Sequence, residues 1–375
     1  MDEDAATRMD QRYRRFLMKG LMGRIAGGAL AALIAIGGGA PAAHAAGKTL
    51  YLFNWQDYIG KGLIKKFEAY CGCKVVQTYY DSNSELEAKL RAGGDSQYDV
   101  VVPSSYYIPQ LVQQGLIRTL DKAKLPNFKN LLPRFRNVSY DPHDAHVVPY
   151  QWGTIVIGYN KDKIKNPPDS WAALFDPKYN SGYPFSMMKG SGRDLIGAAC
   201  AYLGEGFACK TKAAWIKAAK LIETQVKRPN FSGFVDGDPT MQQLKKGVVA
   251  IGMTWSGSVA QCYADKTCLN IGWILPKEGS EAWVDNMAIP THAPDPELAY
   301  KFINFILGAK QGAELSNFNM YPSPNAASAP YLDKAIKQPL VTPTPAQIKR
   351  LSFLPALTPA QSKEFGAIWT AVRQH

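Results

Sequence analysis

The sequence predicts an α/β fold of two lobes with a cleft between them, each lobe a mainly parallel sheet flanked by helices. Three observations support this class. Strand and helix patterns alternate along the chain, the pattern shifts near residues 149–153, and a second alternating region follows. The 375 residues suffice for about two domains. With 46% hydrophobic and only 20% charged residues, the chain can bury sizeable cores and is not disordered.

The first region contains three strand–helix units. The expected elements are strand 49–54, helix 63–70, strand 75–79, helix 82–90, strand 99–103 and helix 107–114. The cap at Asp81 and Ser82 marks the start of the second helix. The run at 99–103 is continuously apolar, which is typical of a strand buried inside a parallel sheet.

The second region begins with a strand at 155–160. Further elements are expected from 171 onward and at 183–187, 193–202, 213–225, 240–246, 248–255, 271–275, 283–289 and 362–373. Residues 296–307 predict an amphipathic helix with Asp295 as its N-cap. We therefore expect lobe 1 to comprise 46–153 and 283–345, and lobe 2 to comprise 154–282 and 346–375.

Residues 1–45 have the organisation of a secretory signal peptide. Basic residues precede an apolar run at 25–36, and Ala43-His44-Ala45 fits the rule for cleavage, so the mature chain is expected to start near Ala46. A transmembrane anchor is the alternative, but a bilayer crossing needs ~20 apolar residues and the run is shorter. We expect an exported, periplasmic protein.

The formal net charge is +12, with basic residues dispersed along the chain. Because no arginine-rich block is present, we interpret this charge as a solvated surface and expect no nucleic-acid partner. A cation site in such a protein must be made acidic locally.

Six cysteines in an exported chain favour disulfides over free thiols. The simplest pairing joins Cys200 to Cys209. By the same argument Cys262 pairs with Cys268, and the two cysteines that flank Gly72 could close a tight loop or pair elsewhere. A zinc site is the alternative, but no histidine lies near the cysteines in sequence.

Aromatic, hydroxyl and acidic side chains gather directly after several predicted strands. Ligands of open α/β sheets lie beyond the carboxyl ends of the strands, so these residues are site candidates. The clusters are 54–58 (NWQDY), 103–107 (PSSYY), 254–258 (TWSGS) and 283–285 (WVD), together with Asp194 and Tyr321. A single such tryptophan usually serves packing, whereas four clusters at one sheet edge favour a binding site.

This mixture of side chains fits a linear organic cation such as a polyamine. Ammonium groups need carboxylates, and the methylenes between them need apolar walls; aromatic faces attract cations and also bury methylenes. Trp283 and Asp285 are two residues apart on a predicted strand, so they share a face. We expect Asp285 to be unpaired in the ligand-free protein.

Seven segments, in order, resemble the periplasmic spermidine/putrescine-binding proteins of ABC transporters: NWQDY, YDVVVPSSYY, PYQWGTIVIGYN, GMTWSGS, LPKEGSEAWVDNMAIP, INFIL and YPSPNAA. They span about Leu50 to Ala327. The resemblance implies a two-lobed periplasmic binding protein fold (type II-like) with crossing hinge strands. It also implies a monomer without a cofactor, which delivers spermidine or putrescine to a membrane ABC permease.

Carried over position by position, the resemblance assigns the ligand contacts. The expected binding residues are Trp55, Asp57, Tyr58, Ser104, Tyr106, Asp194, Trp255, Ser258, Trp283, Asp285 and Tyr321. Ser191 departs from the spermidine-type pattern, which has a second acid three residues before Asp194. Ser258 matches that type, so the amine preference stays open.

Three other functions are alternatives to polyamine binding. An enzyme of the hydrolase kind needs a nucleophile–base pair, but no histidine lies in the clusters; His143 and His146 could form a metal pair, though a solvated turn is favoured. A ferric-ion-binding protein would use adjacent tyrosines, which 79–80 and 106–107 offer. A sensor that passes the same ligand to a membrane receptor stays open.

Overall fold

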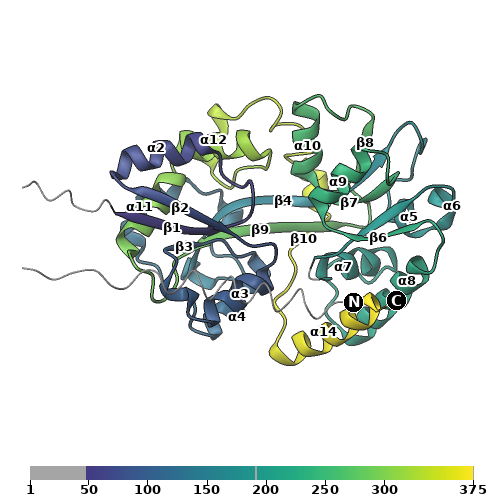
Figure 1. Ribbon diagram of the computed structural model, residues 1–375, viewed down its shortest axis with the longest axis horizontal. Helices are drawn as coiled ribbons and strands as arrows, with labels where there is room; N and C mark the ends of the chain where they lie inside the picture. The colour runs from purple at the N-terminus through teal and green to yellow at the C-terminus, as the bar shows by residue number, and fades with distance from the viewer. Residues whose placement is uncertain (1–47, 191, 375) are drawn as a thin grey trace, which may run out of the picture. The chain divides into compact units, whose positions relative to one another are not determined.

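The computed structural model describes residues 48–190 and 192–374 (Figure 1). The described residues all belong to one compact unit of the chain, which starts at Ala46. The predicted signal peptide and Ser191 lie outside the described residues. None of the helices in the described part combines the length and apolar character that a bilayer crossing requires.

The described strands form one sheet in the order β2-β1-β3-β9-β4-β7-β5-β6, with β10 beside β9 and β8 beside β4. Their bounds are β1 Thr49–Asn54, β2 Lys74–Tyr79, β3 Val100–Val101, β4 Val147–Asn160, β5 Phe185–Met188, β6 Phe231–Val235, β7 Ile251–Trp255, β8 Ile271–Ile274, β9 Ser280–Ala288 and β10 Leu351–Ser352. Parallel pairs join β1 to β2 and β3, and β5 to β6 and β7. The predicted α/β class is confirmed. The sheet is mixed, since β4 pairs antiparallel with β7, β8 and β9, and β3 pairs antiparallel with β9.

The long strand β4 connects the two halves of the sheet. Its first part, Val147–Thr154, pairs antiparallel with β9, and residues 155–159 pair with β7. Figure 1 shows β4 and β9 running through the middle of the unit, with β1–β3 on one side and β5–β7 on the other. Residues on β4 and β9 therefore lie between the two halves. The lobe boundaries drawn from the sequence stay a prediction.

Helices cover both halves of the sheet. They are α2 Lys61–Cys71, α3 Asn83–Arg91, α4 Ile108–Gln113, α5 Ala172–Phe175, α6 Pro177–Asn180, α7 Arg193–Tyr202, α8 Lys212–Val226, α9 Gly237–Lys245, α10 Ser256–Ala264, α11 Pro296–Ile306, α12 Ala309–Asn319, α13 Pro345–Ile348 and α14 Pro359–Arg373. The predicted cap of α11 is present, since the Asp295 carboxylate accepts a hydrogen bond from the Leu298 N–H at 2.9 Å.

One strand differs from its prediction in a way that matters for the site. β9 begins at Ser280, three residues before the expected start at Trp283. The prediction missed this start because a buried strand is recognised by apolar residues, and Ser280 and Glu281 are polar. In the structure both side chains are nevertheless buried.

The described cysteines form local disulfides. Cys71–Cys73, Cys200–Cys209 and Cys262–Cys268 have Cα–Cα distances of 5.2, 6.3 and 5.6 Å, within the range that a disulfide spans. This confirms the two predicted local pairs and shows that the cysteines around Gly72 pair with each other. Cysteines bonded in this way are not available as zinc ligands.

Candidate functional site

Asp285 lies at the centre of the candidate site, on β9 between the two halves of the sheet. Its carboxylate accepts hydrogen bonds from the Tyr58 hydroxyl at 2.5 Å and the Ser104 hydroxyl at 2.6 Å. Tyr58 comes from the loop after β1, and Ser104 follows β3, where its backbone bridges to Asp285. The sequence correctly predicted this convergence. The expectation that Asp285 is unpaired was wrong, because two hydroxyl groups serve as its donors.

Burial changes the protonation of Asp285. The side chain is 6% exposed, and this burial raises its pKa to about 6, although the hydrogen bonds from Ser104 and Tyr58 act to lower it. No ion pair joins Asp285 to a Lys, Arg or His among the residues that the structure describes. A carboxylate in this setting is stabilised by a cation brought from outside.

Three aromatic rings pack in a series that reaches Asp285 through Tyr58. The ring centroids of Trp283 and Tyr321 are 4.7 Å apart, and those of Trp255 and Trp283 are 6.0 Å apart, with interplanar angles of 82° in both pairs. Tyr58 lies 6.0 Å from Tyr321 by the same measure. We call Tyr58, Ser104, Trp255, Trp283, Asp285 and Tyr321 the acid–aromatic cluster.

Two glycines let these rings approach the backbone. A Cβ atom on Gly257, in the first turn of α10, would lie 2.3 Å from the Tyr321 ring, and one on Gly153, in β4, would lie 2.4 Å from the Trp283 ring. Any larger residue at either position would displace the ring. Sequence reasoning missed this role, because the ring that each glycine meets comes from a distant part of the chain.

The predicted residues Trp55 and Tyr106 lie next to the cluster with partners of their own. The Trp55 indole N–H donates to the Val102 carbonyl at 2.9 Å, and its ring centroid is 4.5 Å from that of Tyr80. The Tyr106 hydroxyl accepts a hydrogen bond from the Asn83 amide at 3.3 Å, and the same amide donates to Ser104 at 3.0 Å. Asn83 therefore supports two predicted residues, a role that no local pattern in the sequence indicates.

Acidic residues gather near Asp57 and Ser258. The Ser258 hydroxyl donates a hydrogen bond to Asp238, at the start of α9. Burial raises the pKa of Asp238, the bond from Ser258 acts to lower it, and the nearby charges of Asp57 and Asp236 raise it further. Asp57 is exposed and has a left-handed backbone with φ 54°. Asp238 is not among the predicted site residues, because the helix expected here starts at residue 240, whereas α9 starts at Gly237. Although the formal net charge of the chain is +12, carboxyl groups gather at this place and make it locally acidic.

Asp194 pairs with a carboxyl group that the sequence analysis missed. Asp194, in the first turn of α7, is 6% exposed, and Glu281, on β9, is 1% exposed. Their carboxyl groups interact directly with each other, and neither oxygen of Glu281 has any other hydrogen-bond partner among the described residues. Burial raises the pKa of both groups, and the charge of Asp194 raises that of Glu281 further. We call these two residues the carboxyl pair.

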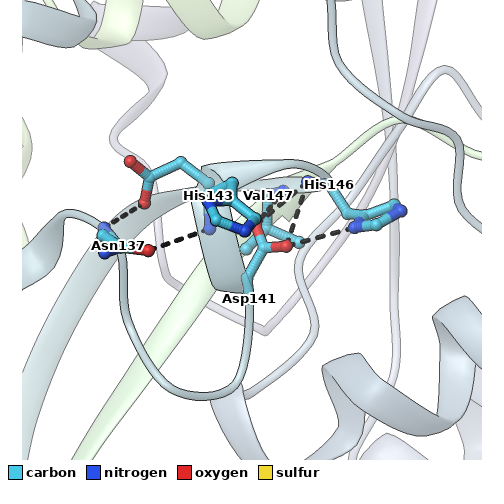
Figure 2. Close-up of polar contacts among 6 residues, drawn as sticks. Asn137, Asp141, His143, His146 and Val147 are labelled. Carbon is cyan, nitrogen blue, oxygen red and sulfur yellow. Dashed lines mark hydrogen bonds and ion pairs between the residues drawn. The ribbon is translucent and has the colours of Figure 1, made fainter.

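The loop that contains His143 and His146, the possible metal pair, is held by hydrogen bonds within the loop. His143 N–H donates to the Asn137 side chain at 2.9 Å, and the Asp141 carboxylate accepts from the backbone N–H of His146 and of Val147 (Figure 2). No group of three or more His, Cys, Asp or Glu side chains in the described part is arranged to hold a metal ion.

The adjacent tyrosines at 79–80 and 106–107, which a ferric-ion site would use, have other contacts or face solvent. The Tyr80 hydroxyl donates to the Val102 carbonyl at 2.5 Å, whereas Tyr79 is 43% exposed on the other side of its strand. The Tyr107 hydroxyl contacts that of Ser84 at 2.7 Å. Neither pair directs two hydroxyl groups to one point.

Comparison with known proteins agrees with this geometry. Residues 62–343 match the family model for bacterial extracellular solute-binding proteins. The spermidine/putrescine-binding periplasmic protein of Salmonella typhimurium is 36% identical over 304 residues, covering 80% of this chain and 84% of that protein. The putrescine-binding periplasmic protein SpuD of Pseudomonas aeruginosa is 35% identical over 367 residues, covering 92% and 98%. The structure of the spermidine/putrescine ABC transporter substrate-binding protein PotD from Streptococcus pneumoniae superposes with a TM-score of 0.75 at 26% identity, covering 87% and 99%.

Proposed function

Because this chain belongs to the family of bacterial extracellular solute-binding proteins, we propose that it captures a polyamine, spermidine or putrescine, and passes it to a membrane ABC permease. The observation that carries the proposal is Asp285. It is a buried carboxylate with hydroxyl donors and aromatic neighbours, and no cation of the described chain pairs with it. A ligand ammonium group supplies the missing charge.

The aromatic part of the cluster suits the rest of a polyamine. Methylene groups bury against Trp283 and Tyr321, and the ring faces also attract the ammonium groups. Further acids, Asp194 on one side and Asp57 on the other, would pair with additional ammonium groups. A neutral sugar would leave these carboxylates without charge partners, and a free amino acid needs a cationic partner for its own carboxylate.

We assign the ligand contacts to the eleven residues predicted from the sequence, with Asp285 as the main charge partner. The relatives that the chain matches are named as binding proteins, and we assign binding without catalysis to this chain as well. Residues 1–45 would direct export to the periplasm, where the protein would act as a monomer.

Native mass spectrometry of the protein purified from its host tests the ligand class, because a retained polyamine is identified by its mass. Calorimetry on ligand-stripped protein should then show binding of putrescine or spermidine, with glucose and free amino acids giving no heat. Tight sugar binding together with no polyamine binding would refute the proposal.

A further inference from the structure

Glu281 has the features of a binding group whose hydrogen-bonding capacity is not met by the described residues. It is buried on β9, and apart from its contact with Asp194, neither carboxyl oxygen has a hydrogen-bond partner among the described residues. Buried carboxyl groups normally accept several hydrogen bonds, so an acid left with one carboxyl neighbour is a costly arrangement. Such an arrangement indicates a role in ligand binding.

The strand places Glu281 in line with the acid–aromatic cluster. Alternate residues of a strand point to the same face, so Glu281, Trp283 and Asp285 form a row in which an aromatic ring separates two acids. Four residues of strand separate the two acids by about 13 Å along the backbone, at ~3.3 Å per residue. The Trp283 indole N–H is also without a partner among the described residues. A linear polyamine has the same order of groups, with charges separated by apolar methylenes.

We propose that Glu281 and Asp194 share one proton in the ligand-free protein and that a second ammonium group of the bound polyamine displaces this proton. The proposal rests on the proposed function. One cation enters, and one proton leaves to the solvent, so the net charge of the site is unchanged. Glu281 is thus a specificity residue, because only a ligand with two suitably spaced ammonium groups reaches both Asp285 and the carboxyl pair.

The surrounding charges explain why the proton stays until a ligand arrives. The titratable groups whose charges act on the pair are Arg193 on α7, Asp236 before α9 and Asp285 on β9, and Tyr106 and Tyr107 after β3 act in turn on Arg193. Arg193 is 8% exposed and offsets one negative charge. A second buried carboxylate has no such offset, and both Asp236 and Asp285 disfavour it, so one member of the pair keeps its proton.

A purely structural role predicts something different. If the pair only joined α7 to β9, ligand binding would leave its proton in place. Proton release on binding therefore separates the two roles, and a change in stability alone does not.

Calorimetry with putrescine at about pH 7.5, in phosphate, HEPES and Tris, measures the number of protons released from the dependence of the heat on buffer ionisation. Alkylammonium groups keep their charge at this pH, since the comparable lysine pKa is ~10.4. Asp285 contributes little, because its pKa of about 6 leaves it almost fully ionised. We expect close to one proton per wild-type molecule and almost none for Glu281→Gln, in which Asp194 is already ionised beside Arg193.

The matched control is Glu297→Gln, an exposed acid of α11, which should release as many protons as the wild type. In the range where release occurs, wild-type affinity should rise about tenfold per pH unit, and that of Glu281→Gln should stay flat. Wild-type binding without proton release, or equal release by Glu281→Gln, would overturn the role of Glu281. If Glu281→Gln fails to fold, the wild-type proton count decides alone. A wild-type protein that binds no polyamine refutes the proposed function itself.

Discussion

Replacing Asp285 with asparagine should weaken ligand binding and stabilise the ligand-free protein. In an unfolded chain this carboxyl has a pKa near 3.9, and in the folded protein burial raises the pKa to about 6. The folded state therefore holds the proton more tightly, and the cost of ionising Asp285 is absent below about pH 4 and complete above about pH 6. Because the pKa of Asp285 rises by about two on folding, its ionisation lowers the free energy of unfolding by about 3 kcal/mol above about pH 6.

The same substitution removes the main partner of the ligand. Leaving a buried charge without its partner costs ~3–5 kcal/mol, which is about 10²–10³-fold or more in affinity. Asp285→Asn should thus raise the free energy of unfolding by up to about 3 kcal/mol near neutral pH, with no change in acid, while putrescine affinity falls by at least two orders of magnitude.

Thermal unfolding of the ligand-free proteins at about pH 4 and pH 7.5, with calorimetry at the higher pH, measures both quantities. Asp333→Asn, on an exposed loop, is the matched control and should change neither. If Asp285→Asn lowers the melting temperature near neutral pH and leaves binding intact, Asp285 is a structural residue and the reasoning is refuted.

Three further outcomes are expected. Gly257→Ala places a Cβ atom against the Tyr321 ring and should weaken putrescine binding by about 1–3 kcal/mol, as measured by calorimetry. The control Gly366→Ala, in α14, has open space around the new Cβ atom and should stabilise the helix slightly. Unchanged putrescine binding by Gly257→Ala would contradict the contact. Tyr58→Phe removes a hydrogen bond that lowers the pKa of Asp285, so calorimetry should show a larger loss of affinity, relative to wild type, at about pH 6 than at pH 8; equal losses would argue against this bond. Small-angle scattering should show a smaller radius of gyration with putrescine, and an identical profile at saturation would count against closure of the two halves.

The sequence predicted features that depend on local patterns or on strand ends. The cap of α11 follows from Asp295 and the proline after it, and Tyr58 and Ser104 meet Asp285 because all three lie where strands of one sheet end or cross. These rules need no knowledge of distant contacts, so they hold without coordinates.

The features that the sequence did not predict depend on contacts between distant segments. Glu281 went unnoticed because a charged residue argues against a buried strand, and only the approach of α7 places Asp194 beside it. Asp238 became visible only through Ser258. The row formed by Glu281, Trp283 and Asp285 was the one available signal, since the face shared by the last two extends to the first.

The disulfides bear on how the protein moves. Each described bond joins cysteines separated by only 2, 9 or 6 positions in sequence, so every crosslink stays within a single stretch of one half. Oxidation therefore stiffens short loops and removes entropy from the unfolded chain without tying the β1–β3 side to the β5–β7 side. The redox conditions therefore affect the stability of the protein, whereas the relative motion of the two halves depends on the connecting strands β4 and β9.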